Sequence, residues 1–326
     1  MKKLIIFPCL LVLLANHLHA SDPLPSWQDT APKKAIIAFV GKATKPGSPD
    51  FVPVEKRIAT FDNDGTLWSE KPLPVQCYFI SDRIKSLAPQ HPEWTNQEPF
   101  ASVLKGDLKS AFAGGDQAIL AMLIATQSGI ATDELEKIVT EWIATARHPQ
   151  TKQLYTKMVY QPMIELLAYL RANGFKTYIV SGGSADFMRP WAETVYGVPP
   201  EQVIGSSLKT QFEFRDGIPA IVGVPELDLM TAGNGKPIGI QSHIGRRPIA
   251  SFGNSDNDLP MMQWTAAGGG THLCLYVHHT DAKREWAYDR KSGDPFDQGL
   301  DEALAKGWTV ASMQDDWKVI YVGDKQ

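Results

Sequence analysis

The stretch from Arg57 to Trp68, which reads RIATFDNDGTLW, constrains the fold most strongly. Its apolar run over residues 58–61 predicts a buried strand, and two carboxylates, Asp62 and Asp64, follow that strand immediately. Carboxylates so close together cost free energy unless a proton or a cation neutralises them, and oxygen ligands favour Mg²⁺. Asp, Asn and Gly are also ordinary turn residues, so a simple turn after the strand stays open at this point.

Length and composition indicate a soluble globular protein. The chain has 326 residues, enough for one large domain or two modest ones. Hydrophobic residues make up 43% and charged residues 21%, which is typical of soluble domains. The net charge of −4 gives no broad basic field, so nucleic acid is not expected as a partner. No segment after the N-terminal leader approaches the length of about 18 apolar residues that indicates a membrane span.

Residues 1–20 have the pattern of a secretory signal peptide. A basic start is followed by an apolar run over residues 4–15, and Ala20 precedes the expected cleavage point. The sequence therefore predicts export to a periplasm, or full secretion, after cleavage near Ala20. Lipid attachment at Cys9 is a minor alternative, because the apolar run before that residue is very short.

Cysteine usage leaves the redox state open. Only Cys77 and Cys274 would remain after cleavage of the leader. An oxidising compartment would permit a disulfide between them. Two cysteines far apart in sequence, without a metal-binding spacing, are more often buried thiols, and that is the favoured interpretation.

The first half of the chain combines an arm, a strand and a helical region. Residues 21–56 are rich in Pro, Lys and Ser, so we expect an arm that leads into the first strand. From Leu73 to about His148 the apolar residues recur at helical spacing, with Thr132 as an expected N-cap. The predicted organisation is an α/β core of residues 21–69 and 156–326, with a helical cap over residues 70–155.

The second half alternates helices and strands. Helices are predicted over 162–173, 185–196 and 300–306, strands over 175–180, 248–252 and 273–277, and a β-hairpin over 203–219. Helices that alternate with buried strands indicate a parallel sheet covered by helices. The expected fold class is therefore α/β, with a Rossmann-like parallel sheet as its core.

Three strand ends and one lysine carry the chemistry. Ligands of open parallel sheets bind at the carboxyl ends of the strands. Here those ends carry Asp62 and Asp64, Ser181 to Gly183, and residues 254–258, while a turn-rich segment presents Lys236. A carboxylate can act as nucleophile and a second one as acid and base, and a lysine, a hydroxyl and a cation can neutralise phosphoryl oxygens. Each element alone has an ordinary structural explanation, but their order together indicates a phosphoryl-transfer site.

The chain resembles phosphatases of the haloacid dehalogenase superfamily, nearest in style to the phosphoserine-phosphatase-like branch, over about residues 55–280. The first motif of that family, Asp-x-Asp-Gly-Thr after a hydrophobic strand, is matched by Asp62 to Thr66. The second, a Ser or Thr at a strand end, is matched by Ser181, and the third, a lysine, by Lys236. The fourth, an acidic strand end, is matched in part by Gly253 to Asp258.

The resemblance implies a role for each matched residue. Asp62 would be the nucleophile and Asp64 the general acid and base. Ser181, the Gly182 backbone and Lys236 would bind the phosphoryl group. Mg²⁺ would be held by Asp62, the carbonyl of Asp64 and a side chain of the fourth motif.

The fourth motif departs from the family pattern. Its first acidic position is Asn254, whose amide oxygen can bind Mg²⁺ but brings no negative charge. We expect Asn254 to be the direct ligand and Asp258 to act through water or Lys236. Asp256 as the ligand in place of Asn254 is the alternative.

The second aspartate discriminates among reactions of the family. A halide leaves without a proton, so Asp64 favours hydrolysis of a phosphate ester or anhydride over dehalogenation. Trp68 and Glu70 follow the first motif, where they either pack at a hinge and on the surface or form a substrate rim, with Glu70 facing an amino group.

The predicted function is a Mg²⁺-dependent phosphatase that hydrolyses small phosphomonoesters through an aspartyl-phosphate. The alternatives are a phosphotransferase of the same fold and a non-catalytic protein that binds phosphate ligands.

Overall fold

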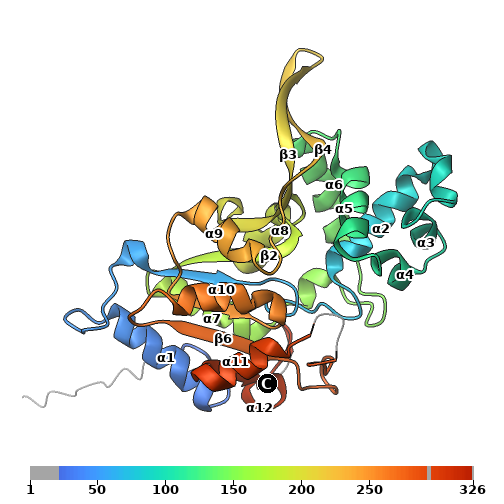
Figure 1. Cartoon of the computed structure of the whole chain (residues 1–326). Coiled ribbons are helices and arrows are strands. Elements are labelled where there is room, and N and C mark those ends of the chain that lie inside the picture. The colour runs from blue at the N-terminus through green and yellow to red at the C-terminus, as the bar shows by residue number, and fades with distance from the viewer. Residues whose placement is uncertain (1–21, 292–294, 325–326) are drawn as a thin grey trace, which may run out of the picture.

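A seven-stranded sheet in the order β4-β3-β2-β1-β5-β6-β7 organises the computed structural model of the chain (Figure 1). The structure describes residues 22–291 and 295–324, so the predicted leader lies outside the described residues. Neighbouring strands are parallel except for the antiparallel hairpin of β3 and β4. The strands are β1 (Ile58–Phe61), β2 (Lys176–Ser184), β3 (Val203–Arg215), β4 (Ile218–Leu229), β5 (Ala250–Gly253), β6 (Leu273–His278) and β7 (Thr309–Ser312).

Helices cover both faces of this sheet. Adjacent residues of a strand point to opposite faces, so Ile179 packs in the main core while Val180 packs against α9 and α10. Both faces are therefore buried, which explains why the central strands read as continuous apolar runs. The helices of the core are α1 (Ala31–Thr44), α7 (Gln161–Ala172), α8 (Ala185–Tyr196), α9 (Gly235–Ile244), α10 (Leu259–Ala266), α11 (Gln298–Lys306) and α12 (Met313–Asp316). This arrangement confirms the predicted α/β, Rossmann-like fold class.

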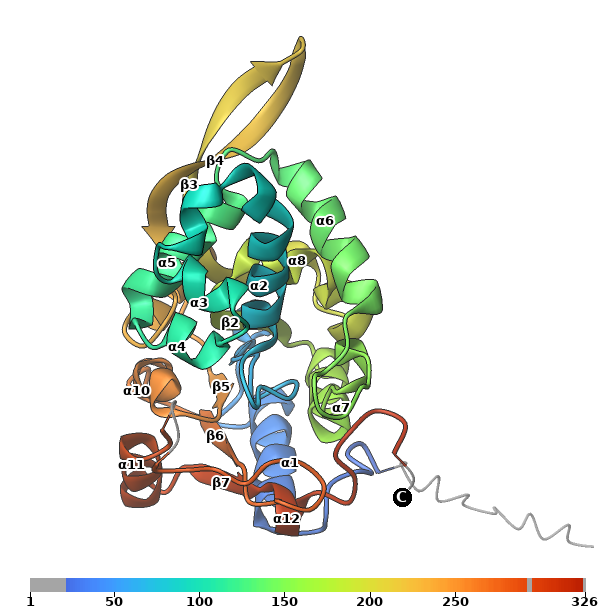
Figure 2. The ribbon, with the colours of Figure 1, turned by 90° about the vertical axis from the view of Figure 1, so that its right-hand side faces the viewer.

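A second group of helices lies between β1 and β2 in the chain. They are α2 (Val75–Leu87), α3 (Phe100–Leu104), α4 (Leu108–Phe112), α5 (Gly115–Gln127) and α6 (Thr132–Thr145). Figure 2 shows them gathered beside the β3–β4 hairpin and apart from α1, α11 and α12. Their apolar stripes are buried, as at Leu135, Val139 and Ile143 of α6. The group falls within the predicted cap of residues 70–155, and the division into domains stays a prediction.

Several predicted elements need correction. The arm expected over residues 21–56 contains α1, because Ile36, Phe39 and Val40 recur at helical spacing and are buried. Lys236 lies in the first turn of α9 rather than in a free turn. Thr132 is the first residue of α6, so the N-cap position belongs to Ala131.

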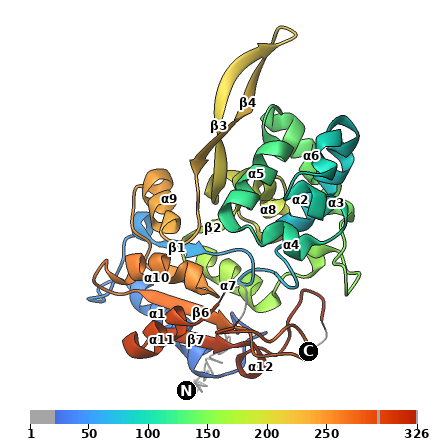
Figure 3. The same cartoon turned by 45° about the vertical axis from the view of Figure 1, so that its right-hand side comes forward.

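The hairpin also differs from its prediction, because β4 continues beyond residue 219 to Leu229. Figure 3 shows the two strands extending well beyond the helices. Both Cys77 and Cys274 carry free thiols, in agreement with the favoured interpretation. Within residues 22–291 and 295–324, helices long and apolar enough to cross a bilayer are absent.

Candidate functional site

The three strand ends meet because β1 lies between β2 and β5 in the sheet. Phe61, the last residue of β1, pairs with Ile179 of β2 and with Phe252 of β5. The backbone N–H of Asp62 then donates to the carbonyl of Phe252 at 2.9 Å. A pocket of about 280 Å³ opens at this edge. Of the predicted site residues, those that line it are Asp62, Asp64, Glu70, Ser181, Gly182 and Lys236.

Lys236 is the buried cation of the site. Its Nζ donates to Asp62 Oδ1 at 2.5 Å, to Asp258 Oδ1 at 2.7 Å and to the Val180 carbonyl at 2.9 Å. These three acceptors use all three protons of the ammonium. Burial lowers the pKa of Lys236, but Asp258 and Asp62 outweigh burial and raise that pKa above its ordinary value. The ammonium is therefore held charged beside the expected nucleophile.

Negative charge exceeds positive charge around this lysine. Burial is the main cause that raises the pKa of Asp62; Asp258 adds to it, Lys236 opposes it and Asp64 contributes least. Two carboxylates thus contact the Lys236 ammonium, and a third, that of Asp64, lines the same pocket. A divalent cation would relieve the imbalance.

The oxygen atoms at this edge are of the kind that Mg²⁺ prefers. They are the carboxylate of Asp62, the main-chain carbonyl of Asp64 and the side-chain amide of Asn254, which is buried next to the loop after β1. Gly65, at φ 73°, makes this closeness feasible, because a Cβ there would meet Asn254 Nδ2 at 2.1 Å. No group of three or more His, Cys, Asp or Glu side chains in the described residues is arranged to hold a metal. A site here therefore depends on amide and carbonyl donors, and the residues present fit Mg²⁺ in that form.

Asp258 and Asp256 have different surroundings. Asp258 Oδ2 accepts from the N–H groups of Asn254 at 2.9 Å and Ser255 at 3.1 Å, so it braces the β5 loop while it holds Lys236. Asp256 accepts instead from three N–H groups at the start of α11, those of residues 297, 298 and 299, at 2.7–3.1 Å. The structure thus directs Asp256 to a helix end rather than to the pocket.

Ser181 and the glycines after it form the phosphate-binding side of the pocket. The Ser181 hydroxyl is buried and accepts from the Gly183 N–H at 3.1 Å. Gly182 is tied to the hairpin through its carbonyl, which accepts from Ser206 Oγ at 2.8 Å. Gln76 of α2 accepts from the N–H of Ser184, the last residue of β2, at 2.7 Å, which connects the end of this strand to the helical group.

Trp68 and Glu70, which were expected either to pack at a hinge and on the surface or to form a substrate rim, are both buried. Trp68 is 1% exposed, and its Nε1 donates to Asp64 Oδ1 at 2.8 Å. Its ring stacks on Trp191 with centroids 4.5 Å apart, so Trp68 packs behind Asp64 and orients its carboxylate. Glu70 lines the pocket but is buried, because its Oε1 lies 3.1 Å from Asn254 Nδ2 and 3.3 Å from Lys71 Nζ. Glu70 is therefore not a surface acid, and its role toward a substrate stays a prediction, since it lines the pocket.

A buried network around His279 was not predicted from the sequence. His279 Nε2 lies 2.7 Å from the Gly65 carbonyl, and its Nδ1 lies 3.2 Å from Glu285 Oε2. Glu285 Oε1 accepts from Ser69 Oγ and Tyr160 OH, each at 2.8 Å. The network fixes the loop that carries Asp64. Local patterns could not reveal it, because its partners lie up to 216 residues apart.

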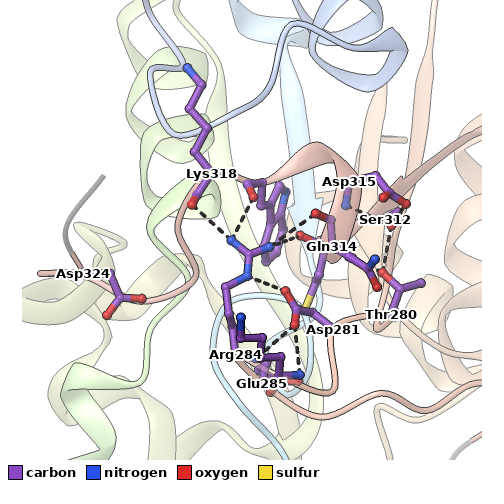
Figure 4. A network of polar contacts seen from close by, with 12 residues as sticks. Thr280, Asp281, Arg284, Glu285, Ser312, Gln314, Asp315, Lys318 and Asp324 are labelled. Carbon is purple, nitrogen blue, oxygen red and sulfur yellow. Dashed lines mark hydrogen bonds and ion pairs between the residues drawn. The ribbon is translucent and has the colours of Figure 1, made fainter.

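Arg284 anchors the segment that carries this network. Figure 4 shows its guanidinium reaching Asp281 and the C-terminal backbone. It donates to the carbonyls of Trp317 and Lys318 at 3.1 Å and to that of Met313 at 2.9 Å. Residues 313–318 therefore hold in place the segment that carries Glu285 and His279.

Comparisons with known proteins identify similar solved structures and a family model. The solved structure of a conserved, functionally unknown protein from Anaerococcus prevotii DSM 20548 is similar at 18% identity and a TM-score of 0.56, over 86% of this chain and 91% of that one. This likeness shows the fold alone. A comparison with curated proteins finds no match.

Two further structures are more distant. A protein of unknown function from Bordetella pertussis Tohama I matches at 19% identity and a TM-score of 0.46, over 78% of this chain and 97% of that one. A phosphoserine phosphohydrolase-like protein from Francisella tularensis subsp. tularensis SCHU S4 matches at 14% identity and a TM-score of 0.40, over 78% and 94%. Neither likeness is close enough to carry an argument.

The family model for haloacid dehalogenase-like hydrolases matches residues 59–263, more than half of the chain. The matched range contains every predicted site residue. The expected family is confirmed: the chain belongs to the haloacid dehalogenase-like hydrolases.

Proposed function

We propose that this protein is a Mg²⁺-dependent phosphatase that hydrolyses small phosphomonoesters through an aspartyl-phosphate on Asp62. The observation that carries the proposal is the buried lysine. Lys236 holds Asp62 at 2.5 Å on the edge of a pocket into which Asp64 also faces. A nucleophile, an acid and base, and a fixed positive charge thus share one small cavity, which is the arrangement that phosphoryl transfer requires.

The first half of the proposed reaction transfers the phosphoryl group to the protein. A carboxylate oxygen of Asp62 attacks phosphorus as the bond to the ester oxygen breaks. Asp64 gives its proton to that oxygen, and the alcohol leaves neutral. Trp68 Nε1, at 2.8 Å from Asp64 Oδ1, keeps the acid in place.

The second half releases phosphate. Asp64, now ionised, takes a proton from water as the water oxygen attacks phosphorus, and Asp62 leaves as a carboxylate. Lys236, the Ser181 hydroxyl and the N–H groups at the end of β2 neutralise the phosphoryl oxygens throughout. Bound Mg²⁺, held by Asp62, the Asp64 carbonyl and Asn254, would add positive charge to the same oxygens.

Turnover of a panel of phosphomonoesters tests the proposal. The purified protein is assayed with Mg²⁺ and with a chelator, beside Asp62→Asn. Metal-dependent phosphate release that the variant loses would support it. If no ester turned over while phosphate analogues still bound, the protein would instead be a phosphate-binding protein. Transfer of phosphate to added glycerol would identify a phosphotransferase.

A further inference from the structure

The two ends of the pocket differ in chemistry. Its floor consists of the polar residues at the strand ends, among them Asp62, Ser181 and Lys236. Its roof consists of side chains from α2, α4 and α5 that are apolar except for Gln76, whose Oε1 already accepts from the Ser184 N–H. The roof residues are Cys77, Ile80, Phe112, Ile119, Leu120 and Leu123. A phosphomonoester bound with its phosphoryl group on the floor would therefore direct its alcohol towards the apolar roof.

The charged side chains of the pocket already have partners. Those among its described lining residues are Asp62, Asp64, Glu70 and Lys236. All three protons of Lys236 are used by acceptors of the protein. Glu70 is engaged by Asn254 and Lys71. The roof residues thus offer an ionic group of the alcohol nothing to pair with, and burying such a group unpaired is costly.

We infer that the natural substrate is a phosphomonoester of an uncharged, apolar alcohol, either alkyl or aryl. This inference rests on the proposed function and names the substrate class for the same site. The reaction stays balanced: water and the ester give inorganic phosphate and the free alcohol. An amino-acid or amino-alcohol ester such as phosphoserine would leave its charged groups against Leu120 and Leu123.

A homologous series of n-alkyl phosphates tests the inference with the unmodified protein. Ethyl, butyl and hexyl phosphate have leaving groups of nearly equal basicity, so differences in kcat/KM report burial of the chain. Each buried methylene should raise kcat/KM by about fourfold until the pocket is filled. O-phosphoserine and phosphoethanolamine should be poorer substrates than propyl phosphate. A flat series, or a preference for the charged esters, would overturn the inference.

A matched pair of variants adds a second readout. Leu120→Asn on α5 should reduce the ratio of hexyl to ethyl phosphate kcat/KM several-fold. Leu304→Asn is the control, because Leu304 is 68% exposed on α11, and it should leave that ratio unchanged. Circular dichroism checks that both variants fold. Equal ratios in Leu120→Asn and the unmodified protein would contradict an apolar subsite at α5.

Failure of the inference and failure of the proposed function give different results. If no ester turned over, the proposed function would fall. The affinities of ethyl-, butyl- and hexylphosphonate, which cannot be hydrolysed, would then show whether the pocket prefers a longer apolar chain. Affinity that rises with chain length would support the apolar subsite, and uniform affinity would overturn it.

Discussion

In the proposed mechanism, Asp64 gives a proton to the leaving alcohol and takes a proton from water. Asp64→Asn preserves the size of the side chain but cannot carry a proton, so turnover of alkyl phosphates should fall by about 10²–10⁴. In Asp64→Asn the rate of phosphoryl transfer to Asp62 should fall less with 4-nitrophenyl phosphate than with alkyl phosphates, because nitrophenolate leaves without a proton. Pre-steady-state assays should then show a burst of nitrophenolate followed by slow turnover, since Asp64 also activates water. Unchanged turnover in Asp64→Asn would exclude its role as acid and base.

Asn254 and Asp256 are both oxygen donors beside β5, and their surroundings predict opposite behaviour. Asn254→Ala should raise the Mg²⁺ concentration needed for half-maximal turnover and reduce the thermal shift that Mg²⁺ produces. Asp256→Ala should leave both unchanged, because Asp256 accepts from N–H groups at the start of α11. It should instead cost about 0.5–2 kcal/mol of unfolding free energy, as the loss of a helix cap does. Unchanged Mg²⁺ dependence in Asn254→Ala would refute the ligand assignment.

The motif residues could be predicted because their signals are local. An apolar run followed by Asp62 and Asp64 indicates its own strand end, and the parallel sheet then brings Ser181 and Asn254 to the same edge. Packing of Trp68 was one of its two expected interpretations, but its stacking partner Trp191, more than a hundred residues away, was not predictable. The burial of Glu70 was not predictable for the same reason, since its partner Asn254 lies 184 residues on.

Secondary structure was predictable where periodicity was sustained. α8 spans Ala185–Tyr196, as expected, because its apolar residues keep a helical stripe up to Gly197. α9 was missed because its sequence begins with Gly235 and carries Pro237, which indicate a turn when tertiary contacts are ignored. Its helix forms because Ile240 packs on Val180 and Ile204 of the sheet. Tertiary packing, rather than propensity, decides these short helices.

The helical group is connected to the core by the segment before α2 and by the segment after α6, and His148 links these two segments through hydrogen bonds. Its Nε2 donates to the carbonyl of Lys71, before α2, at 2.8 Å. Its Nδ1 accepts from the N–H groups of Gln150 and Thr151, beyond α6, at 3.2 and 3.1 Å. One nitrogen donates and the other accepts, so the ring is neutral. Burial, the main cause, lowers the pKa of His148 below its ordinary value.

This lowered pKa predicts a pH-dependent stability. The native state binds fewer protons than the unfolded chain below about pH 6.5, so the contribution of His148 is complete above that pH and is lost as the pH falls from there. Urea unfolding at pH 7 and pH 5 should show a smaller acid loss in His148→Gln than in the unmodified protein. Some loss should remain, because burial also lowers the pKa of His278. The control is His243→Gln, at an exposed position of α9. Equal acid losses in the unmodified protein and His148→Gln would contradict the assignment.

Contacts between distant parts of the chain hold the loop after β1, which carries Asp64, in its position. The rings of Trp27 and Trp317 lie edge to face with centroids 5.8 Å apart, so both ends of the described chain pack together. Arg284 ties this region to the segment that carries His279 and Glu285. Figure 4 shows Glu285 directly beside Arg284 in that segment. The C-terminal residues thereby support the loop of Asp64, a role that the sequence did not reveal.

The central link of this support is the buried pair of His279 and Glu285. The His279 ring lies between two acceptors, the Gly65 carbonyl and the Glu285 carboxylate. Burial raises the pKa of Glu285, but the hydrogen bond and charge of His279 outweigh burial and lower that pKa. The carboxylate also accepts from Ser69 and Tyr160 and from the Trp286 N–H at 2.6 Å. An amide cannot accept from all of these donors.

Glu285→Gln should therefore be strongly destabilising although it preserves the shape of the side chain. Breaking a buried, hydrogen-bonded ion pair should cost about 3–5 kcal/mol of unfolding free energy, measured by urea denaturation at pH 7. Glu226→Gln is the matched control, because Glu226 forms an ion pair of 2.8 Å with Lys209 on the surface, where solvent weakens the pair and the loss of stability should be far smaller. Turnover of the folded fraction should also fall in Glu285→Gln alone, because Glu285 would no longer orient the His279 ring that faces the Gly65 carbonyl. Equal losses of stability in the two variants would show that this network does not hold the catalytic loop.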